Sequence, residues 1–160
     1  MKIRLAKEKD VAFADEIYKN AKAFMAKNGN PDQWSDDYPS GKDVLSGISD
    51  GTSYVCEDGG EIVATFYFKV GEDPTYIKIY DGEWLSPAPY AVIHRIAVKY
   101  PGRGIIGFIF DECSKLHSHL KIDTHEDNLP MQAALKKAGF KHCGTIYLPN
   151  GEPRIAFEKC

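Results

Sequence analysis

The stretch YPGRGIIGFIFD, residues 100–111, decides the fold of this chain, because it joins an apolar segment to a helical one. Glycines at 102, 104 and 107 give it the spacing G-x-G-x-x-G. It follows AVIHRIAV (91–98), which predicts a buried strand, and it opens residues 104–118, whose apolar positions have helical periodicity. A glycine-rich turn at the start of a helix presents unpaired backbone N–H groups that suit a phosphate. The sequence therefore predicts a phosphate-binding turn here.

The rest of the chain predicts strands and helices on either side of this unit. Residues 2–6 alternate like a short strand, residues 11–25 have helical periodicity, and Ser40 caps a second helix over 41–50. Residues 76–80 form either an edge strand or part of a long loop. Further strands are expected over 52–57, 61–70, 91–98, 120–124, 140–148 and 154–159, with a helix over 128–138 that Gly139 closes. No linker or repeat divides residues 1–160, so we expect a single domain with a mixed sheet covered by helices.

Composition excludes several classes of function. The 160 residues are 43% apolar and 27% charged, with a net charge of −3, so no basic face for nucleic acid is expected. No apolar run approaches the roughly 20 residues of a membrane helix, and the first ten residues, MKIRLAKEKD, lack the apolar core of a signal peptide. The four cysteines form no C-x-x-C pair. These features predict a cytoplasmic protein with reduced thiols, bound to neither nucleic acid nor membrane.

The glycine spacing also fits the fingerprint of a dinucleotide-binding protein. Asp123 follows Gly102 by about 20 residues, at the end of the next predicted strand, where such proteins carry an acidic residue. However, Lys99, Tyr100 and Pro101 separate the strand from its first glycine, and the flanking hairpins leave no place for a doubly wound parallel sheet. An NAD-dependent oxidoreductase is therefore the weaker interpretation.

Two segments resemble the GCN5-related N-acetyltransferase (GNAT) family. They are HRIAVKYPGRGIIG (94–107) and DTHEDNLPMQAALKKAGF (123–140), and the resemblance extends over nearly the whole chain. It implies a GNAT-type α/β fold, also called the acyl-CoA N-acyltransferase fold: a twisted mixed β-sheet with helices on both faces. It also implies acetyl-CoA as the acyl donor, a small-molecule or peptide amine as the acceptor, and a homodimer as a possible assembly.

The resemblance implies a site for acetyl-CoA between two central strands that splay apart. In this family the first strand binds the pantetheine arm, the glycine loop binds the pyrophosphate, and an asparagine approaches the arm. The loop here departs from the family pattern, because Pro101 stands where a polar residue is usual and Ile106 where a small one is usual. The residues carried over are Ile96, Ala97, Val98, Gly102, Arg103, Gly104, Ile105, Ile106, Gly107 and Asn128.

Acetyl transfer by direct attack needs a base for the amine, donors for the oxyanion and an acid for the departing thiolate. The tyrosine that serves as this acid in many GNAT proteins is replaced here by Leu135. His94, with a near-neutral reference pKa, is our candidate base, and Tyr147, at the end of a strand, our candidate acid. Strand alternation predicts that His94 faces the same side as Ile96 and Val98. The missing tyrosine and the altered loop also leave open a non-catalytic module that binds coenzyme A or another nucleotide.

The acceptor pocket is expected around residues 28–40, which carry Trp34, Tyr38 and three aspartates, with Trp84 and Tyr90 as further wall residues. Aromatic rings and carboxylates suit an ammonium group. His125 and Glu126 follow the second central strand toward the same cleft. We expect no metal, because the H-x-H spacing at a helix end directs two rings apart. The residues considered for a metal are His117, His119, Asp123 and His125.

Overall fold

The computed structural model describes all 160 residues and contains one seven-stranded mixed sheet in the order β1-β2-β3-β4-β5-β7-β6. Only β4 and β5 pair in parallel, and the other neighbours are antiparallel. The strands are β1 (Lys2–Leu5), β2 (Ser53–Asp58), β3 (Glu61–Val70), β4 (Ala91–Val98), β5 (Leu120–Thr124), β6 (Lys141–Tyr147) and β7 (Pro153–Lys159). The helices are α1 (Val11–Lys27), α2 (Gly41–Asp50), α3 (Ile105–Leu116) and α4 (Leu129–Lys137).

The predicted elements are present, with differences of a few residues at their ends. The open alternative at residues 76–80 is settled in favour of a loop: residues 71–90 contain a 3₁₀ turn, Pro74–Tyr76, and form no strand, although an isolated bridge joins Tyr80 to Thr145 of the edge strand. Asp73 caps that turn and Pro74 starts it, a combination that favours a turn over a strand.

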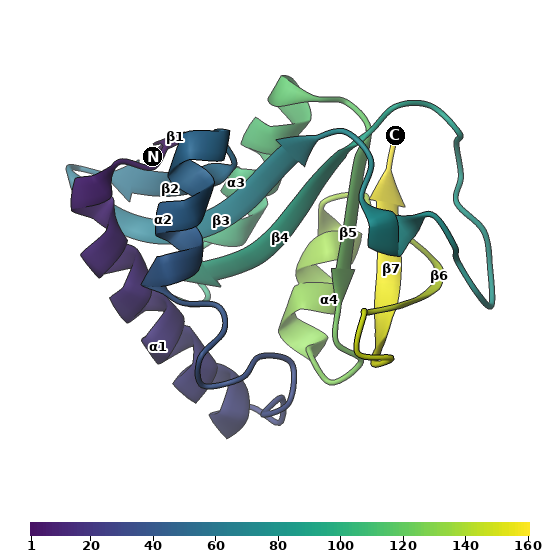
Figure 1. The fold of residues 1–160 in the computed structure, drawn as a ribbon, viewed down its shortest axis with the longest axis horizontal. Helices are drawn as coiled ribbons and strands as arrows, with labels where there is room; N and C mark the ends of the chain where they lie inside the picture. Colours follow the sequence, from purple (N-terminus) through teal and green to yellow (C-terminus); the bar gives the residue numbers. More distant parts are fainter.

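Helices cover both faces of the sheet, as predicted. In Figure 1, α1 and α2 lie in front of the strands and α3 and α4 behind them. The front helices bury Ile17, Tyr18 and Val44 against β2, β3 and β4, while the rear helices contribute Ile109 and Phe110 to the larger core. None of these helices combines the length and the apolar character that a membrane span requires.

The central strands β4 and β5 separate along their length. Their ladder contains only the pairs Ala91–Leu120 and Val92–Lys121. Beyond these pairs the two ribbons diverge toward their carboxyl ends (Figure 1). The facing edges of both strands are therefore unpaired at the ends where the glycine loop and α4 begin, which confirms the splay expected from the GNAT resemblance.

Candidate active site

A bulge in β4 directs the side chains of its central residues. Tyr67 of β3 pairs with His94 and Thr65 pairs with Ala97, so Phe66 alone opposes two residues of β4. Arg95 accommodates the extra residue with a left-handed backbone, φ +55°, and its carbonyl accepts a 2.8 Å hydrogen bond from the Tyr18 hydroxyl. Bulges re-aim side chains in this way.

The bulge overturns one expectation about His94. Ile93 and Ile96 both belong to the rear core, whereas the His94 ring lies against Tyr67 and Tyr76 on the front of the sheet. The prediction that His94 shares a face with Ile96 and Val98 was wrong, because strand alternation fails where two residues of one strand oppose a single partner. The front face thus receives both His94 and Arg95.

The splay opens into a cavity of about 1310 Å³, the rear cavity, which is bounded by β4, the glycine loop, α3 and α4 and extends to the end of the front helix α1. Arg103 lies outside this lining, with its guanidinium 5.0 Å from the centre of the Tyr100 ring, at the exposed rim. Every other residue expected to bind acetyl-CoA lines the cavity: Ile96, Ala97, Val98, Gly102, Gly104, Ile105, Ile106, Gly107 and Asn128.

The start of α3 is open toward this cavity. Gly104 is the N-cap residue with φ +76°, and no side chain caps the helix, so the first-turn N–H groups have no side-chain partner. A Cβ atom on Gly107 would meet nothing within 4 Å. Ile106, the departure from the family loop, packs partly against the rear core while it lines the cavity. The arrangement offers amide donors and the positive end of a helix dipole to an anionic group.

Asn128 connects the rear cavity to the loop that follows α1. Its Oδ1 accepts from the N–H of Met131 at 3.2 Å and so caps α4. Its Nδ2 donates to Oε1 of Gln33 at 2.9 Å, and Asn30 donates to the same oxygen at 2.8 Å. Through these bonds residues 28–34 are tied to α4 across the splay.

In front of the splay, a cluster of polar side chains surrounds His94. His94 Nε2 lies 2.7 Å from Oδ2 of Asp73, and its Nδ1 lies 3.6 Å from Oδ1 of Asp123 on β5. The Tyr76 hydroxyl donates to that same Asp123 oxygen at 2.6 Å. The contact with Asp73 orients the imidazole, and the cluster places a histidine, the commonest general base, beside two carboxylates.

Asp73 is positioned by its own turn. Its Oδ1 accepts from the backbone N–H and the hydroxyl of Thr75, at 2.9 and 2.6 Å, which leaves Oδ2 for His94. Burial alone would raise the pKa of Asp73, but the hydrogen bonds from His94 and Thr75 outweigh it and hold the pKa well below its usual range. Asp73 is therefore a carboxylate throughout the neutral range. Sequence reasoning missed it, although Asp-Pro-Thr is a recognisable cap.

Buried polar contacts dock the rest of the 71–90 loop on the sheet. Glu158 accepts from the N–H of Leu85 at 2.6 Å and from His119, whose Nδ1 faces the carbonyl of Pro89 at 3.1 Å. Trp84 donates to the carbonyl of Tyr76 at 2.8 Å, and this bond holds Tyr76 in place beside His94. The loop is thus a fixed wall of the front site.

Comparison with solved structures identifies the family. The chain is 31% identical to a GNAT-family acetyltransferase from Streptococcus agalactiae, with a TM-score of 0.90 over 99% of this chain and 94% of that one. The chain belongs to the GNAT family of acetyltransferases. No protein-family model and no curated protein matches the sequence.

More distant GNAT structures share the fold. An acetyltransferase of the family from Listeria monocytogenes has 18% identity and a TM-score of 0.68 over 99% of this chain and 93% of that one. The aminoglycoside acetyltransferase AAC(6')-Ib, solved with coenzyme A and kanamycin, has 20% identity and a TM-score of 0.66 over the same shares. The dinucleotide-binding interpretation is therefore wrong for the fold, since the splayed mixed sheet is that of GNAT proteins.

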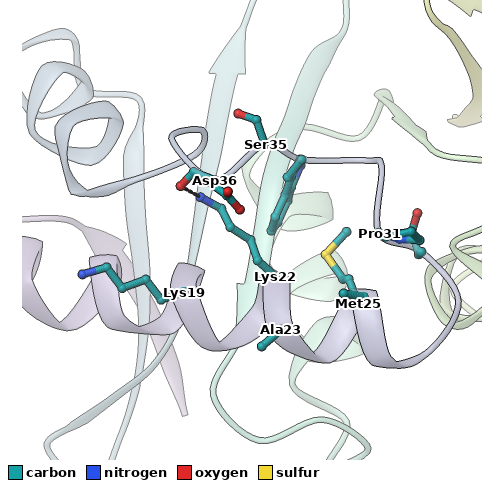
Figure 2. A pocket seen from close by; sticks show the side chains of 10 residues that line it. Lys19, Lys22, Ala23, Met25, Pro31, Ser35 and Asp36 are labelled. Carbon is teal, nitrogen blue, oxygen red and sulfur yellow. Dashed lines mark hydrogen bonds between the residues drawn. The ribbon is translucent and has the colours of Figure 1, made fainter.

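The loop after α1 in this GNAT protein contributes unequally to the two sides. Trp34 packs edge-on against Tyr18, with 5.7 Å between ring centres, and so anchors the loop to α1. Figure 2 shows Lys22 reaching from α1 to Asp36, whose carbonyl accepts its hydrogen bond at 3.0 Å, beside a smaller cavity of about 340 Å³. Tyr38 extends to the front site, where its ring centre lies 5.9 Å from the guanidinium carbon of Arg95.

The two positions considered for the GNAT acid lie away from the cluster. Leu135 is fully buried in the rear core, and its hydrocarbon side chain has no acidic proton to donate. Tyr147 lies at the end of β6, an edge strand, and packs against Tyr80 with 5.2 Å between ring centres. Its hydroxyl makes no hydrogen bond to His94 or to Asp123. Tyr147 therefore stays a prediction from the sequence.

The histidines weighed as metal ligands have separate partners. His117 bonds to the backbone of His119, and Nδ1 of His125 lies 3.6 Å from Asp127. Asp123 belongs to the cluster around His94. His119 lies instead with Glu158 and Cys160, and the potential ligand atoms of these three residues are within 4.8 Å of one another.

Proposed function

We propose that this protein transfers an acetyl group from acetyl-CoA to the primary amine of a small molecule, by direct attack of the amine on the thioester. The observation that carries the proposal is the splay of β4 and β5, with a cavity for the donor behind it and a histidine flanked by carboxylates in front. Membership of the GNAT family supports acetyl transfer as the chemistry.

The donor fits the rear cavity. The open start of α3 and the positive-φ glycines at 102 and 104 suit the diphosphate of coenzyme A, because they bring backbone N–H groups close to it. The unpaired edge of β4 at Ile96, Ala97 and Val98 would bond to the pantetheine arm as an added strand does. An N–H group of this edge would polarise the thioester carbonyl and stabilise the oxyanion.

His94 is the proposed base. An amine arrives as an ammonium ion at neutral pH, and it must lose a proton before it can attack. The carboxylates of Asp73 and Asp123 attract the ammonium, and His94 between them accepts its proton. Asp73 acts as a positioning residue, because its contact with Nε2 orients the ring.

The nitrogen then forms a bond to the acetyl carbon, its second proton passes to solvent, and the carbon–sulfur bond of the tetrahedral intermediate breaks. Coenzyme A leaves as a thiolate. A thiol has a reference pKa of about 8.5, so its anion is a competent leaving group without an obligatory acid. We therefore assign protonation of the thiolate to solvent, with Tyr147 as the side chain to be tested for a contribution.

Turnover with a panel of primary amines tests the proposal. The protein should release free thiol from acetyl-CoA with at least one amine, and acetyl-CoA alone should raise its melting temperature. Thermal protection by acetyl-CoA without thiol release from any amine would overturn the assignment, and would favour a module that binds coenzyme A without catalysis. If acetyl-CoA neither raised the melting temperature nor released thiol, acetyl-CoA would be excluded as the donor as well.

A further inference from the structure

Arg95 is a largely buried cation whose side chain donates no hydrogen bond. Its side chain is 15% exposed, and its Nε is buried without a hydrogen-bond partner. The guanidinium carbon lies 5.0 Å from the centre of the Tyr67 ring and 5.9 Å from that of Tyr38. The faces of aromatic rings stabilise a cation above them, but they accept no hydrogen bond from N–H groups that lie in the plane of the guanidinium. The donors of Arg95 therefore have capacity for an anion.

The other partly buried arginines of the chain are hydrogen-bonded. Arg4 donates two hydrogen bonds to Asp10, at 2.7 and 3.1 Å, and one to Glu57 at 3.0 Å. Arg154 donates to the carbonyls of Pro153 and Gln33, at 2.8 and 3.1 Å. Arg95 alone among the three lacks such bonds. Because a buried charge is normally paired, the unpaired N–H donors of Arg95 are evidence for a ligand.

Asp43 does not accept a hydrogen bond from Arg95. Its Oδ1 lies 3.8 Å from Nη1 of Arg95, beyond hydrogen-bond distance. Its Oδ2 accepts from the N–H of Ser40 at 2.8 Å, as part of the capping box at the start of α2. The carboxylate is thus held by the helix that it caps.

The bulge places the unpaired guanidinium of Arg95 next to His94, the proposed base. His94 and Arg95 are consecutive, and both lie on the front of the sheet, where Tyr67 contacts the two side chains. On the His94 side the charged groups are the carboxylates of Asp73 and Asp123. On the Arg95 side the guanidinium makes no hydrogen bond, and its ion pair with Asp43 is 3.8 Å long. The front site therefore has a negative and a positive part side by side.

We propose that the acceptor is a small amino acid, whose amine is bound between Asp73, His94 and Asp123 and whose carboxylate is bound by Arg95. This inference rests on the proposed function, which leaves the acceptor undefined. A guanidinium presents paired N–H donors that match the two oxygens of a carboxylate. With the carboxylate held by Arg95, the amine of the same molecule is directed to His94 and to the thioester.

The discriminating experiment compares amino acids with their amides, which keep the amine and lose the negative charge. Glycine, β-alanine and 4-aminobutyrate, with the proteinogenic amino acids, form the panel, each paired with its amide, and thiol release gives kcat/KM. For the preferred acceptor we expect the acid to exceed its amide by at least about tenfold, because a site built for a carboxylate discriminates against analogues that leave its donors unpaired. Equal rates, or faster turnover of the amides, would overturn the proposal.

Variants assign the preference to Arg95. In Arg95→Gln the acid-to-amide ratio should fall to within about threefold of one, whereas Arg95→Lys should keep part of it, because it retains the charge without the paired donors. The KM for acetyl-CoA should be unchanged in both. Lys42→Gln, which removes an exposed cation from the same face of the protein, is the matched control and should keep the full ratio. An unchanged ratio in a folded Arg95→Gln protein would refute the role of Arg95.

A binding measurement on the unaltered protein separates failure of this inference from failure of the proposed function. With coenzyme A present, N-acetyl amino acids should raise the melting temperature more than the corresponding N-acetyl amides. Equal shifts would overturn the carboxylate subsite whether or not turnover is seen. If coenzyme A itself binds but no amine is turned over, a larger shift from the acids would support the subsite and refute only the catalytic assignment.

Discussion

The rear and the front of the splayed sheet build their halves of the site from different materials. The rear cavity is lined largely by one continuous stretch, from β4 through the glycine loop into α3, together with residues of α1 and α4, and it includes the uncapped start of α3. The front site consists of side chains from β4, β5 and the 71–90 loop, joined by charged hydrogen bonds. Backbone donors suit a ligand common to a family, whereas side chains can change to suit an individual acceptor. We therefore expect the front site to set the acceptor specificity of this GNAT protein.

The largest effect should follow from loss of the proposed base, which belongs to the front alone. His94→Gln should lower kcat by about 10²- to 10⁴-fold, the usual contribution of a general base. The melting-temperature shift with acetyl-CoA should be retained, because His94 does not line the rear cavity. Steady-state kinetics and thermal unfolding measure the two effects. A variant with full kcat would show that water or another side chain takes the proton.

Asp73→Asn should have the next largest effect, about ten- to a hundredfold on kcat, since it leaves His94 in place but loses the charge that orients it. Its pH dependence gives a second measurement. The folded pKa of Asp73 is lowered, so its contribution to stability is complete above its unfolded value near 3.8 and is lost as the pH falls below that value. The difference in melting temperature between pH 5 and pH 3 should therefore be smaller in Asp73→Asn than in the unaltered protein. Equal differences would exclude the proposed interaction.

Gly107→Ala tests the rear cavity and should produce opposite effects on stability and binding. The new methyl group meets no protein atom within 4 Å, and alanine is favoured over glycine in a helix by up to about 1 kcal/mol. Unfolding should therefore require slightly more denaturant. The KM for acetyl-CoA should nevertheless rise about tenfold, because the methyl group keeps the diphosphate from the helix backbone, and the acceptor KM should not change. An unchanged donor KM would place the diphosphate elsewhere.

The smallest effect is expected for Tyr147→Phe. The Tyr147 ring packs on Tyr80 at the far edge of the sheet, two strands from β5. The variant keeps that packing, so kcat should stay within about twofold, as for most substitutions away from the reacting groups. The pH–rate profile should also be unchanged. Loss of its alkaline limb would instead identify Tyr147 as the acid, and would require the β6 end to approach the donor during turnover.

Sequence patterns identified most of the fold and the rear half of the site, because those signals are local. The bounds of β3, β4, β5 and α2 agree with the hydrophobic periodicity, and Ser40, Gly51 and Gly139 end or begin helices as their conformations require. The phosphate-binding turn was readable because strand, glycines and helix are contiguous in the chain. Nothing in the pattern at Arg95, however, signals the bulge that reverses the predicted direction of His94.

By itself, then, the sequence determined the order of the elements, the family resemblance and the donor loop, all of which depend on residues a few positions apart. Only the tertiary structure decided the front site. Asp73, His94 and Asp123 are separated by 21 residues or more, and they meet because the 71–90 loop docks on β5 through Tyr76 and Asp123 and on β7 through Glu158. The unpaired donors of Arg95 likewise cannot be read from a sequence, because whether a side chain finds hydrogen-bond partners depends on how the folded chain packs around it.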